Sequence, residues 1–231
     1  MKQFAELSRS NPLFNGVGKE EFLPLLDCLQ ARKYSYKKGE LIFLADSSVT
    51  KLGIVLSGCI NTVYEDVLGG RSIIGYFVAG QLFCDAFACS TKQHLPVSIV
   101  AQVDSEVLLI EVKRILHTCE KSCAQHKMLA ENLLHILADK YVALNRKMIH
   151  LSGRTTYRKL LSYLSEQMRL AGGNPFTIPF NRQELADYLF VDRTGLSVQW
   201  SNLKAQGILS EKNGLYSLNI TPCDGADCAE T

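Results

Sequence analysis

The stretch Asn181-Arg-Gln-Glu-Leu-Ala-Asp-Tyr-Leu-Phe-Val-Asp-Arg-Thr-Gly-Leu-Ser-Val-Gln-Trp-Ser-Asn-Leu-Lys-Ala-Gln-Gly207 carries the signals of two short helices and the turn between them. Asn181 and Glu184 have the spacing of a capping box, in which each side chain accepts a hydrogen bond from an unpaired amide at the helix start. Asp192 can cap a second helix in a similar way. The sequence therefore predicts a helix after Asn181, a turn, and a second helix over residues 193–205.

Apolar and polar side chains fall on opposite faces of these two helices. The positions predicted to face the core are Leu185, Ala186 and Leu189 in the first helix and Leu196, Trp200 and Leu203 in the second. The opposite face of the second helix presents Arg193, Thr194, Ser197, Val198 and Ser201. A small polar face that begins with an arginine suits the major groove of DNA, which is about 12 Å wide. Helix pairs of this geometry also occur in purely packing roles, so this face alone leaves both possibilities open.

A hairpin is predicted after the second helix. Ile208–Leu209 and Leu215–Ile220 are apolar runs, and the turn Glu211-Lys-Asn-Gly214 lies between them. Asn-Gly supplies the positive φ angles of a tight hairpin turn. Thr155–Leu170 adds a preceding amphipathic helix, so residues 152–220 are predicted to form a winged helix-turn-helix domain.

The N-terminal half reads differently, as short apolar or alternating runs separated by glycines. The predicted strands are Leu41–Ala45, Leu52–Leu56, Ile60–Tyr64, Ser72–Val78, Val97–Val103 and Val107–Val112. Short strands at regular spacing indicate an antiparallel sandwich or barrel. We therefore expect an α+β protein whose residues 1–122 form an antiparallel β-barrel or jelly roll (a double-stranded β-helix).

A long helix is predicted over residues 123–151. Its apolar positions recur every four or three residues: Leu133, Leu137, Tyr141, Leu144 and Met148. A helix of about 28 residues is about 42 Å long, which exceeds what the cover of a small barrel requires. We expect this stripe to be the interface of a homodimer. The alternative is one amphipathic helix that packs on its own domain.

Composition sets wider bounds. Hydrophobic residues make up 47% of the 231 residues and charged residues 21%, which is typical of a folded globular protein. The segment 151–220 is mildly basic although the whole chain carries only +2, and residues 221–231 read as an acidic, mobile tail. No apolar leader opens the chain, and Gln81 and Asp85 interrupt its most apolar stretch. We expect a cytoplasmic protein with no membrane segment, in which the eight cysteines are reduced.

Several motifs resemble those of the Crp/Fnr family of transcription regulators, and they cover nearly the whole chain. In the C-terminal part they are Arg182-Gln-Glu-Leu-Ala-Asp-Tyr-Leu189, Val191-Asp-Arg193, Leu196-Ser197 and Leu203-Lys-Ala-Gln-Gly-Ile208. In the N-terminal part they are Lys38-Gly-Glu40, Leu56-Ser-Gly58, Gly80, Ser98-Ile-Val-Ala101 and Asp104-Ser-Glu-Val107. The resemblance implies a DNA-binding transcription regulator, with an operator in double-stranded DNA, a small-molecule effector and RNA polymerase as partners. It adds Arg182 and Gln183 to the predicted DNA contacts.

The effector pocket that the resemblance implies departs from the pattern of cyclic-nucleotide binders. Its residues would be Gly80, Gln81, Leu82, Phe83, Leu95, Pro96, Val97 and Ser98. Gln81 stands where a glutamate usually binds the ribose, and Leu95-Pro96 stand where an Arg-Ser pair usually binds the phosphate. Without that arginine the phosphate loses a charge-assisted contact worth roughly 1.5–3 kcal/mol per hydrogen bond. Cyclic AMP is therefore not expected as the effector, and the sequence identifies neither the effector nor a cofactor.

Two departures concern the DNA-binding part. Val198 stands where many relatives have an arginine after the serine, so the operator is expected to differ from the best-known family sites. Phe190 replaces a common turn glycine, which leaves the geometry of the bend between the helices open.

The cysteines and histidines do not have the spacing of a recognised metal-binding motif. Only Cys28 lies in the N-terminal region, which argues against an iron–sulfur cluster with closely spaced cysteines. Cys119, Cys123 and His126 share one face of a helix and are the candidates for a metal or redox input. The favoured interpretation is that they are small apolar thiols and a polar helix edge.

Two other functions stay open. A cupin-like metalloenzyme is disfavoured because the barrel region offers only His94, so we expect no enzyme activity. A barrel-based sensor that acts on a protein partner without specific DNA binding is the second alternative, and Val198 is the residue that favours it.

Overall fold

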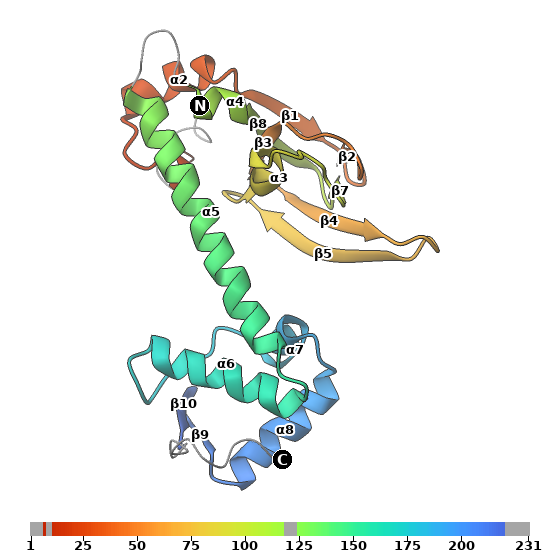
Figure 1. Ribbon diagram of the computed structural model, residues 1–231, viewed down its shortest axis with the longest axis vertical. Coiled ribbons are helices and arrows are strands. Elements are labelled where there is room, and N and C mark those ends of the chain that lie inside the picture. The colour runs from red at the N-terminus through yellow and green to blue at the C-terminus, as the bar shows by residue number, and fades with distance from the viewer. Residues whose placement is uncertain (1–6, 8–10, 118–123, 220–231) are drawn as a thin grey trace. The chain divides into compact units, whose positions relative to one another are not determined.

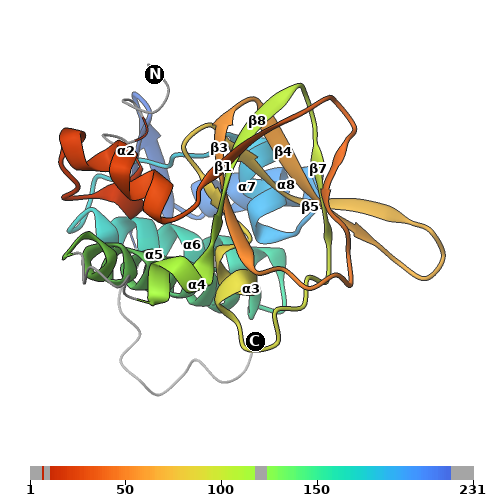
Figure 2. The same cartoon turned by 90° about the horizontal axis from the view of Figure 1, so that it is seen from above.

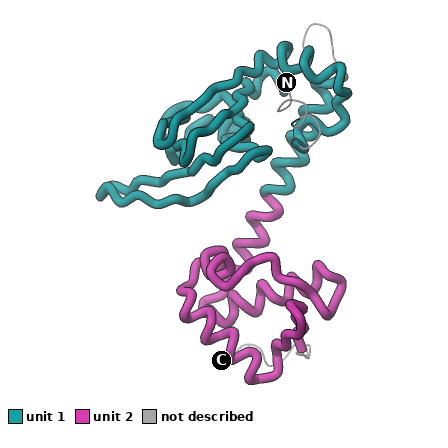
Figure 3. Tube along the Cα trace, turned by 180° about the vertical axis from the view of Figure 1, so that it is seen from behind, with its two compact units in different colours: residues 1–140 teal, residues 141–231 magenta. Residues whose placement is uncertain are grey.

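The computed structural model describes residues 7, 11–117 and 124–219. The chain divides into two compact units, residues 1–140 and 141–231 (Figure 3). Each unit has its own cluster of buried hydrophobic side chains, and the two clusters share no residue. The Cys119 and Cys123 thiols and the predicted tail 221–231 lie outside the described residues.

Two four-stranded antiparallel sheets form the centre of unit 1 (Figure 1). One sheet has the order β1-β8-β3-β6 and the other the order β2-β7-β4-β5. The strands are β1 (Arg32–Tyr36), β2 (Leu41–Phe43), β3 (Lys51–Ser57), β4 (Cys59–Glu65), β5 (Arg71–Val78), β6 (Leu82–Phe83), β7 (Ser98–Ala101) and β8 (Ser105–Glu111). The antiparallel jelly-roll prediction is confirmed, in the form of two sheets.

All six predicted strands are present, and two further strands complete the sheets. β1 was missed because Arg32-Lys-Tyr-Ser-Tyr36 is polar and mostly exposed, so it has no apolar run to mark it. β6 has only two residues, which is too short for a sequence period. The prediction over Val97–Val103 was too long, since β7 ends at Ala101 and residues 102–104 are a bend before β8.

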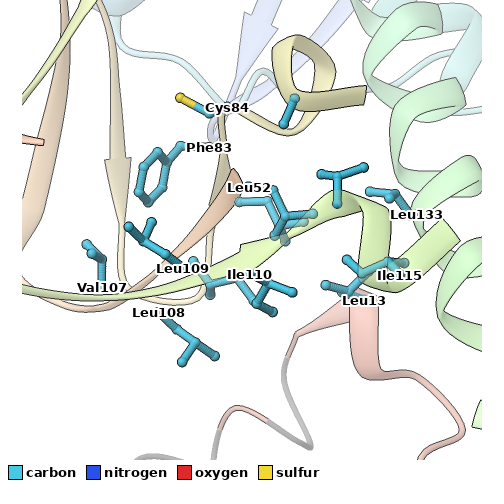
Figure 4. Close-up of a cluster of buried hydrophobic side chains, with 14 of the residues drawn as sticks. Leu13, Leu52, Phe83, Cys84, Val107, Leu108, Leu109, Ile110, Ile115 and Leu133 are labelled. Carbon is cyan, nitrogen blue, oxygen red and sulfur yellow. The ribbon is translucent and has the colours of Figure 1, made fainter. Parts of the chain in front are cut away.

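Strand β8 is buried on both faces. Val107 to Ile110 are all buried, although a strand with one wet face would alternate. Figure 4 shows Val107 and Leu109 on the side of Phe83, and Ile110 on the side of Leu13 and Ile115. Helical segments cover that second side. They are the short η1 (Pro12–Phe14), α2 (Lys19–Cys28), α4 (Val112–Leu116) and the N-terminal half of α5 (Ala124–Leu151).

Helix α5 corrects one interface prediction. Leu133 is 1% exposed and belongs to the buried cluster of unit 1, beside Leu13 and Ile115 (Figure 4). Leu137 is half-buried against the same cluster. The N-terminal half of this helix therefore packs on its own domain, as the alternative interpretation required. Among the described residues no helix is both long and apolar enough to span a bilayer.

Unit 2 consists of helices and one hairpin around a single core. Its elements are α6 (Thr156–Leu170), α7 (Arg182–Leu189), α8 (Arg193–Ala205), β9 (Leu209–Lys212) and β10 (Leu215–Leu218). The core includes Leu160, Leu164 and the six residues predicted for α7 and α8. Asn213 and Gly214 have φ angles of 54° and 76°, so the hairpin turn has the positive φ angles that Asn-Gly predicts.

Candidate functional site

The N-terminus of α8 is fixed by Asp192. Its Oδ1 accepts hydrogen bonds from the amides of Thr194 (2.7 Å) and Gly195 (3.0 Å). These amide contacts, with Gly195 first, hold the pKa of the Asp192 carboxyl below its ordinary value. The carboxylate thus stays charged at the positive end of the helix dipole, where it stabilises the helix.

Helix α8 exposes the predicted face. Arg193, Thr194, Ser197, Val198 and Ser201 are all exposed, while Leu196, Trp200 and Leu203 are buried. The Ser197 hydroxyl donates to the Arg193 carbonyl (2.9 Å), and the Ser201 hydroxyl donates to the Ser197 carbonyl (3.0 Å). Their oxygens can still accept from donors outside the helix. The face therefore offers one cation, hydroxyl acceptors and the methyl groups of Val198, which can contact a thymine methyl.

Helix α7 starts with the capping box that the sequence predicts. The Asn181 side chain accepts from the amides of Gln183 and Glu184, and the Glu184 carboxylate accepts from the Asn181 amide (2.7 Å). Gln183 is exposed and its amide donates to Asp187 (2.8 Å). Gln183 thus lies exposed at the start of α7.

The sequence predicts that Arg182 contacts DNA, whereas the structure places its side chain against Trp200 within unit 2. Its guanidinium carbon is 3.0 Å from the centroid of the Trp200 ring, and burial lowers its pKa, which contact with Tyr216 and Glu211 partly offsets. The side chain is half-buried. Arg182 therefore joins α7, α8 and the hairpin, and its guanidinium is engaged within unit 2.

The turn between α7 and α8 contains a contact that sequence reasoning missed. Phe190 has a φ of 50° and a ψ of 56°, the left-handed conformation that glycine adopts without strain. The Lys147 ammonium lies 4.6 Å from the centroid of the Phe190 ring and 5.1 Å from that of Tyr188. Lys159 donates to the Leu189 carbonyl (3.3 Å). Two lysines from α5 and α6 therefore support this turn.

The end of α5 is fixed within unit 2 by a buried histidine. His150 is 2% exposed, and its Nε2 lies 2.7 Å from Glu166 Oε2 while its Nδ1 lies 3.0 Å from Ser162 Oγ. Arg146 also pairs with Glu166 (3.5 Å). These contacts hold the end of α5 on α6, which in turn contacts α8.

Apart from the half-buried Leu137, the α5 stripe is exposed after Leu133. Leu134, Tyr141, Leu144 and Met148 each expose more than half of their surface, as does Ile149. Leu134, Tyr141 and Met148 are seven residues apart, which is the spacing of a coiled-coil seam. The exposed stripe therefore begins at Leu134, whereas the sequence predicts that it begins at Leu133.

The predicted effector pocket is largely packed protein interior. Leu82, Phe83, Leu95 and Val97 all belong to the buried cluster of unit 1. Ser98 Oγ accepts from the Ala45 amide (3.0 Å). Gln81 is exposed, and its Oε1 accepts from the Val78 amide (2.9 Å). Gly80 turns the chain with a φ of 87°, and Pro96 is exposed.

Three phenylalanine rings meet between the two sheets. Phe83 lies 6.4 Å from Phe43 and 6.2 Å from Phe77 between ring centroids. Phe83 also packs directly on Gly53, where a Cβ would come within 2.0 Å of its ring. The interior next to the predicted pocket is therefore apolar and aromatic.

The segment after the predicted pocket is attached to α5. Helix α3 (Asp85–Cys89) begins with the buried Asp85 carboxylate, which pairs with the Lys140 ammonium at 2.7 Å. Lys140 also donates to the Leu82 carbonyl (3.2 Å). Burial, followed by the Asp85 charge, raises the pKa of the neighbouring Cys84 to about 12, so Cys84 remains a thiol. Lys140 thus joins α5 to both Leu82 and Asp85.

The metal candidates are only partly placed. His126 is buried and contacts Cys28, whereas Cys119 and Cys123 lie outside the described residues. Within residues 11–117 and 124–219, no three His, Cys, Asp or Glu side chains come together as a metal site.

Comparison with known proteins agrees with this architecture. Residues 33–122 match the cyclic nucleotide-binding domain family. A CooA variant from Carboxydothermus hydrogenoformans is 19% identical, with a TM-score of 0.51 over 83% of this chain and 85% of its own. The c-di-GMP responsive regulator CLP of Xanthomonas campestris is 16% identical, with a TM-score of 0.50 over 86% of this chain and 100% of its own. No curated protein sequence matches the chain.

The chain therefore combines a unit whose residues 33–122 are similar to the cyclic nucleotide-binding domain family with a winged helix-turn-helix unit. Its fold is shared with the CooA and CLP regulators, as the resemblance noted from the sequence implies.

Proposed function

We propose that the chain is a cytoplasmic, homodimeric transcription regulator of the Crp/Fnr type that binds operator DNA through the exposed face of α8. The observation that carries this proposal is the exposure of Arg193, Thr194, Ser197, Val198 and Ser201 on a helix whose start is capped by Asp192. Gln183 is proposed as a phosphate contact. RNA polymerase is the proposed further partner, and no enzyme activity is proposed.

The proposed domain roles follow the sequence boundaries. Residues 1–122 sense an effector, residues 123–151 form the dimerisation helix and residues 152–220 bind DNA. The exposed α5 side chains Tyr141, Leu144 and Met148 support the dimer. The effector is proposed to be a small molecule other than cyclic AMP, because Gln81, Leu95 and Pro96 offer no cation to a phosphate.

Selection of bound sequences from a random DNA pool tests the proposal. A dimer should select a two-fold symmetric site whose half-sites are about 34 Å apart, one helical turn of DNA. Arg193→Ala should relax the preference at one base pair and weaken binding by about 1–3 kcal/mol if Arg193 contacts guanine. If no sequence is enriched, or if neither Arg193→Ala nor Val198→Arg alters the consensus, α8 does not read DNA. The chain would then act on a protein partner, the alternative that Val198 favours.

A further inference from the structure

One glycine of α8 is not required by the fold. Gly195 lies in the first turn of this helix, and its φ angle is not positive. A Cβ built on it would lie in open space, with no described atom within 4 Å beyond its chain neighbours and its own helix backbone. Its amide donates to Asp192 (3.0 Å), a bond that alanine would make equally well. Since glycine destabilises a helix relative to alanine, folding alone would favour a side chain here.

Gly195 begins one flank of α8, which continues with Gln199 and Asn202. These positions are four and three residues apart, so they share one side of the helix. Each of them follows an exposed residue and precedes a buried residue of the core. Figure 2 shows α8 beside α7, and contacts with α6, α7 and β9 hold its buried side. The flank therefore runs along the border between the exposed face of α8 and the core of unit 2.

The side chains of this flank offer hydrogen-bond donors. Asn202 is exposed and Gln199 is half-buried. Within residues 11–117 and 124–219, neither side-chain amide makes a hydrogen bond. Asparagine and glutamine side chains donate to phosphate oxygens in protein–DNA complexes. The flank is therefore chemically suited to a sugar–phosphate backbone, although it carries no positive charge.

The width of the major groove explains why the missing side chain matters. An α-helix with its side chains is about 10–12 Å across, and the groove is about 12 Å wide. A helix therefore enters deeply only where its flanks are thin. Glycine allows a backbone to approach another molecule closely. Because Asp192 already occupies the Gly195 amide, the advantage of the glycine is this close approach and not an amide that is free to bind an anion.

We propose that the flank formed by Gly195, Gln199 and Asn202 packs against the sugar–phosphate backbone of one DNA strand, at the wall of the major groove. Asn202 donates to a phosphate oxygen of that strand. Gly195 is a positioning residue, because its missing side chain sets the depth at which Arg193 and Val198 meet the base edges. This inference rests on the proposed function and adds to it a groove wall that is contacted without regard to sequence.

Larger residues at Gly195 separate folding from DNA binding. Alanine and leucine favour a helix more than glycine does, so Gly195→Ala and Gly195→Leu should melt no lower than wild type. On the duplex that wild type selects from a random pool, Gly195→Ala should bind about fivefold or more weakly, the lower limit for an extra methyl group in a close-packed contact. Gly195→Leu should bind more weakly still.

Gly75→Ala is the matched control for the change from glycine to alanine. Gly75 lies in β5 of unit 1 without a positive φ angle. A Cβ there would be 3.6 Å from Thr62 Oγ1, an ordinary contact distance. This variant should bind the selected duplex as wild type does.

Asn202→Ala tests the phosphate contact. It should weaken binding by about tenfold, as expected for a hydrogen bond to a charged group. The selected consensus should stay unchanged, because a phosphate contact carries no sequence information. The dependence of affinity on salt concentration should also keep its slope, because a neutral amide displaces no counterion.

Three results would overturn the proposal. The first is wild-type affinity in Gly195→Ala while Arg193→Ala binds more weakly, which would remove the flank and leave the proposed function standing. The second is a consensus that Gly195→Ala or Asn202→Ala alters at one base pair, which would make the flank a reader of bases. The third is a wild type that selects no sequence, in which case the proposed function itself fails. If Gly195→Ala does not fold, Asn202→Ala decides.

Discussion

The guanidinium of Arg182 lies over the ring of Trp200, so that α7 is attached to α8 by a cation–π contact. Arg182→Met keeps the length of the side chain and removes its charge, so it should lower the stability of unit 2 by about 0.5–2 kcal/mol. Denaturant unfolding followed by Trp200 fluorescence measures this. Gln183→Ala, one residue along and exposed, should leave stability almost unchanged and weaken DNA binding. The opposite pattern would show that Arg182 contacts DNA, as the sequence predicted.

The left-handed conformation of Phe190 predicts that glycine is better tolerated than alanine at this position. Alanine normally stabilises a chain relative to glycine, but at a φ of 50° it carries a steric cost of roughly 1–2 kcal/mol that glycine avoids. Both variants lose the ring and its contact with Lys147. Phe190→Gly should therefore be more stable than Phe190→Ala in a thermal melt. Equal stability, or a more stable alanine variant, would show that the turn adopts another conformation.

The Asp192 cap predicts a pH-dependent stability. The pKa of Asp192 is lower in the folded chain, so its contribution is complete above the unfolded value of about 3.9. It is lost as the pH falls through the folded pKa. Asp192→Asn keeps a capping oxygen without a titrating charge, so its melting temperature should approach that of wild type as the solution is acidified. Asp192→Ala should melt lower at neutral pH. If the melting temperatures of wild type and Asp192→Asn change in parallel with pH, the charge of Asp192 does not contribute to stability.

The dimer prediction rests on the exposed α5 stripe. Tyr141→Asp combined with Leu144→Asp should place charges in the apolar seam and separate the protomers, at a cost of several kcal/mol. Leu68→Asp is the control, because Leu68 is 93% exposed in the β4–β5 turn and carries the same chemical change. Analytical ultracentrifugation should find monomers only for the α5 variant. A dimer in both would place the interface elsewhere.

The effector region predicts a negative result with cyclic nucleotides. Calorimetric titration with cyclic AMP or cyclic GMP should give no isotherm in the micromolar range, since Leu95 is buried and Gln81 closes its own turn. Phe83→Ala should empty volume between the sheets and destabilise unit 1 by about 3–5 kcal/mol. Micromolar binding by wild type would mean that another residue supplies the missing cation.

Local signals determined how much of the fold was predictable. The capping box at Asn181, the Asp192 cap and the Asn213-Gly214 turn act over a few residues, so sequence spacing located α7, α8 and the hairpin. The apolar runs likewise marked the longer strands. β1 carries no apolar alternation, because its side chains are mostly exposed, and its pairing with β8 includes an ion pair between Lys33 and Glu106 (2.6 Å) that no local signal marks.

Contacts between distant residues were not predictable in the same way. The sequence presented Arg182 as one exposed cation in a DNA-binding motif, and only the fold brings Trp200 and Tyr216 beside it. Leu133 fits the same four-and-three spacing as Leu137, and the fold of unit 1 decides that it faces inward. Cys28 and His126 are 98 residues apart, so no spacing rule links them.

The separate cores of the two units have a calorimetric consequence. A chain whose units unfold independently gives two heat-absorption peaks, and no single melting temperature describes it. Trp200 is the only tryptophan and lies in the core of unit 2, so its emission follows unit 2 alone. Differential scanning calorimetry of wild type and Phe83→Ala should assign the two peaks. Only the peak of unit 1, which has no matching transition in tryptophan emission, should shift in the variant.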